Sequence, residues 1–439
     1  MDWLVIVGIL LFALGLILSI ALHEVGHLVP AKLFGVKVTQ YMVGFGRTVW
    51  SRRRGETEYG VKSVPLGGYI RMIGMFPPEP GGDPKRLRKA STGPIQALIE
   101  DARKTAGEEI QPGDEERVFY RKPWWKKLII MLGGPAMNVI LALLLAGGVL
   151  MTFGNPEKPV LAPTVSEVSE CVIPAGAERT ACAAEDPPAP AAEAGFEAGD
   201  HIVSFDGRPV DSWEEVSGAI RAAGAGTVDV EVERDGERLT LTPDLVRAER
   251  PVAGGSDAEE PEYAEVGFLG VRPLIVDYEQ EDVTGVAAWS GTFVVRMLDA
   301  MAGIPERMGN VWDAAFNGAE RDPDTPVSIV GAGRIGGEIV SELAGAERIV
   351  TFVMLLATFN MAIAIFNLIP LLPLDGGHAA GAIWEGIKRG VARLVRRPAP
   401  RPVDVAKGLP IAYGVAVVLI GMAALLIYAD IVSPITLFG

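Results

Sequence analysis

The sequence predicts a multi-pass α-helical membrane protein that has four transmembrane helices, a cytoplasmic-side β-hairpin element and an extracytoplasmic α/β domain. Of its 439 residues, 49% are hydrophobic. These residues concentrate in four long runs without charge, and about 20 residues of helix are enough to cross the core of a bilayer. Basic and acidic residues also separate between the segments that join the runs. The uncharged runs are residues 3–22, 128–156, 349–374 and 408–429.

The distribution of charge gives the four predicted helices an orientation. Residues 32–127, between the first and second runs, carry a net charge of +8, and residues 371–408, between the third and fourth, carry +4. The long segment 154–345 carries −24. Lys and Arg close to the membrane mark its cytoplasmic side. We therefore expect both basic loops in the cytoplasm, and the middle segment and both termini outside the plasma membrane.

The first predicted helix, residues 1–31, carries the strongest chemical signal, the sequence HEVGH. His23 and His27 are four residues apart, so both imidazoles leave one face of the helix about a turn from each other. That spacing suits two nitrogen ligands of one zinc ion, with Glu24 placed to act as a general base toward water. The alternative is two ordinary histidines at a helix end. The chain has only four histidines, and ionisable groups at membrane depth are functional by default.

A β-hairpin element is predicted for residues 32–76, where polar and apolar residues alternate on both sides of the charged tip SRRRGE. A free strand edge within residues 57–72 would allow an extended peptide to add as a further strand. Residues 77–122 are rich in Pro, Gly and charge, which is typical of a flexible insertion. The stretch RKPWWKK then marks the membrane interface at the start of the second helix, residues 123–154.

In the exterior segment, residues 160–246 predict strands and one helix joined by Asp-Gly turns. Their order and the string AGD-x-I-x-x-x-D-G resemble a bacterial PDZ domain, which binds extended peptides or chain ends by adding a strand. Residues 247–283 are expected to form an acidic linker and a strand. Helical spacing of apolar residues within 284–346 predicts amphipathic juxtamembrane helices, including one helix over 285–316.

The only two cysteines, Cys171 and Cys182, also fall in the exterior segment. A disulfide between them fits an oxidising compartment, and two free thiols are the alternative. His201 lies on a predicted strand of the same segment. We expect it to be exposed and to have no metal role.

A third metal ligand is predicted far away in the chain. Asp375 is the first charged residue after the third helix, residues 347–374. The first and third helices cross the membrane in the same direction, so Asp375 reaches the face near which HEVGH lies. Pro370 would break the helix there, and irregular backbone at membrane depth is tolerated where it lines a cavity. The alternative is that Asp375 only caps the next helix. Residues 375–407 continue as a basic cytoplasmic loop to the fourth helix, residues 408–431.

Three motifs together resemble the site-2 proteases, which are intramembrane zinc metalloproteases. They are HEVGH in the first helix, GGPAMN in the second and NLIPLLPLDGGH at the end of the third. The strings PLGGYIRM (residues 65–72) and FYRKPWWKK also fit the bacterial branch, of the type that regulates sigma factors and carries an extracytoplasmic PDZ domain. One departure from the usual NxxPxP spacing is that Pro373 comes one residue later.

The resemblance implies a site and a reaction. It implies His23, His27 and Asp375 as zinc ligands and Glu24 as the catalytic base. It also implies that further residues bind substrate or orient the site. The expected reaction is hydrolysis of a peptide bond in or near the transmembrane segment of single-pass proteins, such as anti-sigma factors or remnant signal peptides, already trimmed outside. The further residues are Asn367, Asn138, Pro370, Gly67 and Gly68.

Two other functions stay open at this point. A catalytically inactive scaffold would use the PDZ-like domain to sort membrane partners, although an intact Glu24 argues against it. A zinc transporter would need ligands on more spans, and the second and fourth runs contain no carboxylate or histidine. The expected partners are membrane substrates and the lipid bilayer. Nucleic acid is not expected, because only one basic aromatic cluster is present.

Overall fold

The computed structural model describes residues 3–77, 110–174, 182–251 and 263–436 of the chain. Most of the flexible insertion that we predicted lies outside these residues, and so does most of the acidic stretch that precedes the last two strands. The described residues form two compact units. One unit is Met1–Met151 together with Asp282–Gly439, and the other is Thr152–Glu281.

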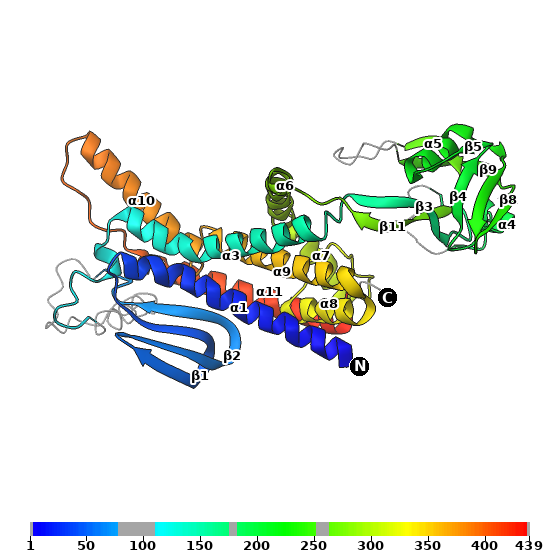
Figure 1. Cartoon of the computed structure of the whole chain (residues 1–439). Coiled ribbons are helices and arrows are strands. Elements are labelled where there is room, and N and C mark those ends of the chain that lie inside the picture. Colours follow the sequence, from blue (N-terminus) through cyan, green and yellow to red (C-terminus); the bar gives the residue numbers. More distant parts are fainter. Residues whose placement is uncertain (1–2, 78–109, 175–181, 252–262, 437–439) are drawn as a thin grey trace. The chain divides into compact units, whose positions relative to one another are not determined.

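The first unit is mainly helical and has one sheet, which lies alongside α1 (Figure 1). Its strands are β1 (Val38–Arg54) and β2 (Thr57–Met72). Its α-helices are α1 (Trp3–Leu33), α3 (Trp124–Thr152), α6 (Val283–Ala302), α7 (Ile304–Phe316), α8 (Ile329–Glu342), α9 (Gly345–Leu368), α10 (Asp375–Leu394) and α11 (Leu409–Val432).

Within the described residues, four helical stretches are long and apolar enough to cross a bilayer. They are α1, α3, α9 and the stretch that ends with α11, which fits a multi-pass membrane protein. The third ends at Leu368, earlier than the predicted residue 374. The cause is local, since Pro370 and Pro373 cannot continue a helix. The chain turns at these prolines and resumes as α10 at Asp375.

The sheet beside α1 is more folded than a simple hairpin. Gly44 and Gly46 adopt positive φ angles of 92° and 86°, which glycine tolerates, and the chain turns there within β1. As a result, Val43 pairs with two separate parts of β2, opposite Val61 and opposite Gly68. We predicted two alternating strands, and the structure bends them into a doubled sheet.

The helix predicted over residues 285–316 is two helices. Gly303 ends α6, and Pro305 stands in the first turn of α7, where its missing N–H costs nothing. The next helix, α8, packs along α1. A Cβ added at Gly8 would overlap the carbonyl oxygen of Gly336 and lie 2.7 Å from Cα of Gly337. Small residues of this kind let two membrane helices approach closely.

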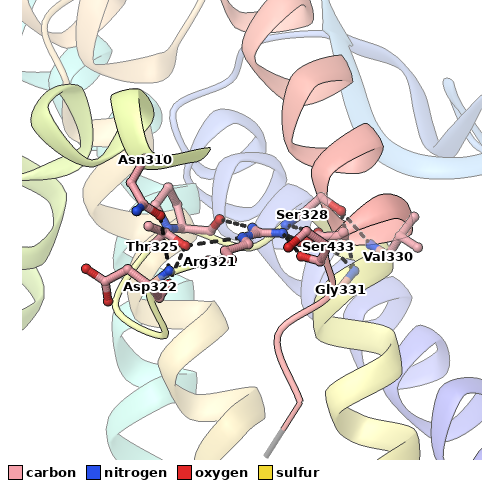
Figure 2. A network of polar contacts seen from close by, with 10 residues as sticks. Asn310, Arg321, Asp322, Thr325, Ser328, Val330, Gly331 and Ser433 are labelled. Atoms are coloured by element: carbon pink, nitrogen blue, oxygen red, sulfur yellow. Dashed lines mark hydrogen bonds and ion pairs between the residues drawn. The ribbon is translucent and has the colours of Figure 1, made fainter. Parts of the chain in front are cut away.

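A buried ion pair joins α11 to the loop between α7 and α8 (Figure 2). Arg321 Nη1 donates to Asp430 Oδ1 at 2.5 Å, and both side chains are almost fully buried. Arg321 also donates to the carbonyl of Ser433. The other oxygen of Asp430 accepts from the backbone amides of Ser328 and Gly331, where α8 begins. Two segments about 100 residues apart in the sequence, residues 321–331 and residues 430–433, are therefore fixed to each other.

The second unit is built on β-sheets. One sheet has the order β11-β3-β4-β7-β8 and another has the order β10-β9-β6. Val216 and Ile220 of α5 pack into a core that contains Ile202 and Val230. The elements are β3 (Pro159–Val168), α4 (Pro190–Ala194), β4 (His201–Phe205), β5 (Arg208–Pro209), α5 (Trp213–Ala223), β6 (Gly226–Thr227), β7 (Val230–Arg234), β8 (Glu237–Leu241), β9 (Asp244–Pro251), β10 (Tyr263–Phe268) and β11 (Val271–Tyr278).

This unit extends beyond residue 246, where we expected the exterior domain to end. Strand β11 pairs with β3, and β10 pairs with β9, so both late strands belong to the unit and not to a linker. Cys171 and Cys182 form a disulfide, which decides between the two alternatives left open by the sequence. His201 is exposed on β4, and its Nδ1 lies 2.9 Å from the hydroxyl of Thr164.

Candidate metal centre

Two imidazoles leave the same face of α1 in its C-terminal half. His23 and His27 are one turn apart, and their ring centroids are 4.9 Å from each other. Their side chains are 12% and 6% exposed. The two Nε2 atoms point to the same place and lie 3.2 Å apart. The spacing of the HEVGH sequence therefore produces the paired nitrogens that it predicts.

Asp375 brings a carboxylate to the same point from the start of α10. Its Oδ2 lies 3.3 Å from Nε2 of His23 and 3.2 Å from Nε2 of His27. Tetrahedral ligands at about 2.0 Å from a zinc ion are about 3.3 Å from one another. The three donor atoms thus have the spacing of one face of such a tetrahedron. Among the described residues, these three form the one group of His, Cys, Asp and Glu side chains with metal-ligand spacing.

The charge state of Asp375 suits a ligand. Although burial raises the pKa of its carboxyl group, the two histidines beside it hold that pKa well below its ordinary value. The group is therefore ionised at neutral pH. An ionised carboxylate and two neutral imidazoles are a donor set that zinc accepts. The site fits the ion in both geometry and chemistry.

The loop before Asp375 is compact despite the late position of Pro373. The Leu374 N–H donates to the carbonyl of Leu371 at 2.9 Å. A Cβ added at Gly376 or Gly377 would strike the backbone of this loop. The two glycines therefore let the loop fold tightly onto the first turn of α10, and Asp375 still reaches the histidines.

Helix α3 closes the site on its other side through small residues. A Cβ at Gly134 would overlap Nε2 of His27 and lie 2.7 Å from Cε1 of His23. On α1 itself, a Cβ at Gly26, next to His27, would overlap the carbonyl of Gly133. The two glycines of the GGPAMN motif therefore allow α3 to lie against both imidazoles.

The same helix orients the rings. His23 Nδ1 lies 2.9 Å from Oδ1 of Asn138, and His27 Nδ1 lies 2.7 Å from the carbonyl oxygen of Ile130. A carbonyl oxygen can only accept, so each Nδ1 carries the proton and each Nε2 keeps its lone pair. Partners of this kind fix the tautomer and the orientation of metal-binding histidines. Asn138 therefore lies beside the candidate metal site.

Glu24 lies beside the metal site, between α1 and the sheet. It retains 8% of its exposure. A Cβ at Gly68 would lie 2.9 Å from Cγ of Glu24, so this glycine leaves the room that the carboxylate needs. Tyr41 of β1 donates its hydroxyl to the carbonyl of Ala21 at 2.8 Å. Burial and the nearby charge of Glu24 raise the pKa of Tyr41 to about 12, so its hydroxyl stays neutral.

The remaining predicted residues are Gly67, Pro370 and Asn367. Gly67 has a φ of 107°, and a Cβ there would lie against the ring of Phe45. Pro370 is exposed in the turn after α9. Asn367 is half-buried near the end of α9, and its side chain makes no hydrogen bond to any described residue.

Two residues that sequence reasoning missed are connected to the site. Asn360 is 1% exposed, and its Oδ1 lies 3.4 Å from Nδ2 of Asn138. Its own Nδ2 donates to Ser19 at 3.0 Å. The sequence could have indicated Asn360, because an amide side chain inside an uncharged membrane-length run is uncommon and usually makes a contact between helices. Its partner could not be named without the packing of α9 on α1 and α3.

Comparison with known proteins identifies relatives of the whole chain. The family model described as peptidase family M50 matches residues 11–397. The zinc metalloprotease Rip1 of Mycobacterium bovis is 36% identical and covers 99% of both chains. Rip1 of Mycolicibacterium smegmatis is 35% identical over 98% of this chain and 99% of its own. Metalloprotease MmpA of Caulobacter vibrioides is 28% identical over 88% of each chain.

Proposed function

Because the chain belongs to peptidase family M50, we propose that it hydrolyses a peptide bond within or near the transmembrane segment of single-pass membrane proteins. It is a zinc metalloprotease with four candidate membrane-spanning helices. The observation that carries the finer proposal is the position of the donors. His23 and His27 stand on a membrane-length helix, and Asp375 meets them at 3.2–3.3 Å.

His23, His27 and Asp375 would hold the zinc ion. When bound, zinc supplies Lewis acidity that activates water and polarises a carbonyl group. Glu24 is the general base: its carboxylate accepts a proton from the attacking water and delivers that proton to the amide nitrogen that leaves. The water oxygen first bonds to the carbonyl carbon, and the peptide C–N bond breaks afterwards, when the nitrogen has received the proton from Glu24. Asn138 keeps the His23 ring in place throughout.

The sheet beside α1 is proposed to hold the substrate extended. A transmembrane helix hides its amides in its own hydrogen bonds, so a segment must unwind before hydrolysis. Gly68 of β2 lies against Glu24, and Gly67 precedes it. A strand at this place would accept an unwound segment by backbone hydrogen bonding. Pro370 and Asn367, on the turn that leads to Asp375, are proposed to contact the same segment.

The second unit is proposed to be PDZ-like and to bind an extended peptide. A groove runs between α5 and residues 266–271 and includes Arg221 and Arg250 in its lining. The Arg250 guanidinium stacks on the ring of Phe268, 4.2 Å from its centroid. An apolar groove with two cationic groups suits a chain end with a free carboxylate. Substrates trimmed outside the membrane would present such an end.

Peptide binding tests this second proposal. A fluorescent peptide with a free carboxyl terminus should bind the full-length protein in detergent more tightly than the same peptide with an amidated end. Arg250→Gln should reduce that preference, because it removes the charge and keeps much of the side chain's length. Equal affinity for the free and amidated peptides would contradict the proposal that the groove binds a chain end.

We propose the orientation that the charge pattern predicts. The two basic segments, residues 32–127 and 371–408, face the cytoplasm. The second unit and both termini lie outside, and the active site faces the cytoplasmic side of the plasma membrane. The scaffold alternative makes a different prediction, since a scaffold would neither hold zinc nor depend on Glu24.

Glu24→Gln tests the catalytic proposal. Gln keeps the size of the side chain but cannot accept the proton of water, so cleavage of a model single-pass substrate should fall by at least about 100-fold, the lower range for loss of general base catalysis. Zinc content should stay at the wild-type value, because Glu24 is not a ligand. Gly68→Ala in the same assay should also lose cleavage and keep zinc. Cleavage at the wild-type rate by Glu24→Gln would refute the mechanism.

A further inference from the structure

A chain of buried hydrogen bonds runs from the zinc site into the helices around it. His23 Nδ1 lies 2.9 Å from Asn138 Oδ1, and Asn138 Nδ2 donates to Asn360 Oδ1 at 3.4 Å. Asn360 Nδ2 donates both to Ser19 Oγ at 3.0 Å and to the carbonyl of Leu356 at 2.8 Å. Asn138 and Asn360 are each 1% exposed and Ser19 is 4% exposed. This series of hydrogen bonds therefore connects α1, α3 and α9 without contact with bulk water.

The donor and acceptor roles in this series of hydrogen bonds are fixed at its end farthest from the metal site. The carbonyl oxygens of Gly15 and Leu356 belong to the backbone and can only accept. Ser19 donates its one hydroxyl proton to Gly15 at 2.9 Å. Its oxygen is then left to accept from an amide. The Asn360 side chain must therefore turn its NH₂ group toward Ser19 and Leu356.

The orientation of the Asn360 amide determines the next contacts. Because its NH₂ group donates to Ser19 and Leu356, Asn360 presents Oδ1 to Asn138. Asn138 must then turn its own NH₂ group toward Asn360. Asn138 then presents Oδ1 to His23. An oxygen at this position requires a proton on Nδ1 of His23 and leaves the lone pair on Nε2. The Nε2 atom is the one that faces Asp375 at 3.3 Å.

We propose that Asn360 is a positioning residue for the zinc ligand His23, acting through Asn138. It fixes the orientation of the Asn138 amide and thereby the tautomer of His23. Without Asn360, the Asn138 amide can rotate by half a turn and present its NH₂ group to Nδ1. The imidazole then carries its proton on Nε2, where it blocks the metal. This inference rests on the zinc site proposed above.

A simple role in helix packing is the competing explanation, because buried amides often hold membrane helices together. The two explanations differ in what they predict for Asn138. If Asn360 acts through Asn138, its effect on zinc binding disappears once Asn138 has been replaced. If it only packs helices, the two effects add, as they do for independent sites. Met361, its neighbour in α9, is also 1% exposed but belongs to an apolar cluster.

The tautomer can be measured directly in metal-free protein labelled with ¹⁵N-histidine. The chain has only four histidines, so His23 can be assigned by comparison with a His23→Asn variant. At a pH where imidazoles are neutral, wild-type His23 should show a protonated Nδ1 and an unprotonated Nε2. Asn360→Leu should show a mixture of both tautomers. A wild-type His23 protonated on Nε2, or an unchanged tautomer in Asn360→Leu, would overturn the proposal.

Zinc competition with a chelator gives the second measurement. Asn360→Leu should raise the zinc dissociation constant about 10-fold, at the low end of the effects seen for groups that orient metal ligands. In the Asn138→Leu background, the same change should have no further effect. Met361→Leu should leave the constant unchanged. Additive losses, or an equal loss in Met361→Leu, would assign Asn360 to packing and contradict the proposal. The tautomer measurement needs no zinc, so it tests this inference even if wild-type protein binds none and the proposed function fails.

Discussion

At the scale of single residues, the imidazoles of His23 and His27 depend on α3 as much as on α1. Asn138 and the carbonyl of Ile130 hold the two Nδ1 atoms at 2.9 and 2.7 Å. Gly134 gives α3 the space to do so. The HEVGH spacing accounts for two nitrogens on one face, but the direction in which their lone pairs point is determined by these neighbours.

Gly134→Ala should therefore damage the metal site. Alanine favours a helix over glycine by about 0.5–1 kcal/mol, yet its Cβ would overlap Nε2 of His27. We expect the zinc affinity to fall about 10-fold or more, in the range found when groups that orient metal ligands are changed. Zinc competition measures it. Gly148→Ala is the matched control on the same helix, because a Cβ there meets nothing within 4 Å. Equal zinc affinity in both variants would contradict the close approach of α3.

The sequence led us to expect His23, His27 and Asp375 at one site, and the reason is physical. Helix periodicity relates the two histidines, and the direction of crossing relates Asp375 to them across some 350 residues of chain. Asn360 could not be related to His23 in the same way. Whether Asn360 faces Asn138 or lipid depends on the rotation of α9 about its axis. A run that is apolar on all sides has no helical periodicity from which that rotation could be predicted.

At the scale of elements, short polar contacts and glycines decide where the helices lie. The membrane-length runs α1, α3 and α9 are recognisable from composition. The helix α8 lies within residues 284–346, where we predicted amphipathic helices, but the sequence did not predict its packing on α1, which depends on glycines such as Gly336 and Gly337. Similarly, the doubled sheet depends on Gly44 and Gly46, whose positive φ angles reverse β1. Alternation of polar and apolar residues predicts a strand but not where the strand reverses.

Arg321→Met should destabilise the first unit. The change leaves the buried carboxylate of Asp430 without its partner, and breaking a buried pair costs about 3–5 kcal/mol. Thermal unfolding in detergent should show a clearly lower midpoint. Arg334→Met is the control, because Arg334 is 44% exposed in its pair with Glu338, and surface pairs contribute about 0–1 kcal/mol. If both variants unfold at the same temperature, the network in Figure 2 does not stabilise the fold as proposed.

At the scale of the whole molecule, the proposed chemistry belongs to one unit. His23, Glu24, His27 and Asp375 all lie in the unit made of Met1–Met151 and Asp282–Gly439. The second unit contributes no proposed ligand or base. Its boundaries were predictable at the start but not at the end, since β11 returns to pair with β3 across about 100 residues, and strand pairing over that distance leaves no local pattern.

The zinc stoichiometry of purified protein tests the central claim most directly, namely that two distant parts of the chain form one metal site. Wild-type protein should contain one zinc ion per chain by elemental analysis. Asp375→Ala should retain little or none after dialysis, because two histidines alone remain. Full zinc occupancy in Asp375→Ala, or no zinc in the wild-type protein, would contradict the claim.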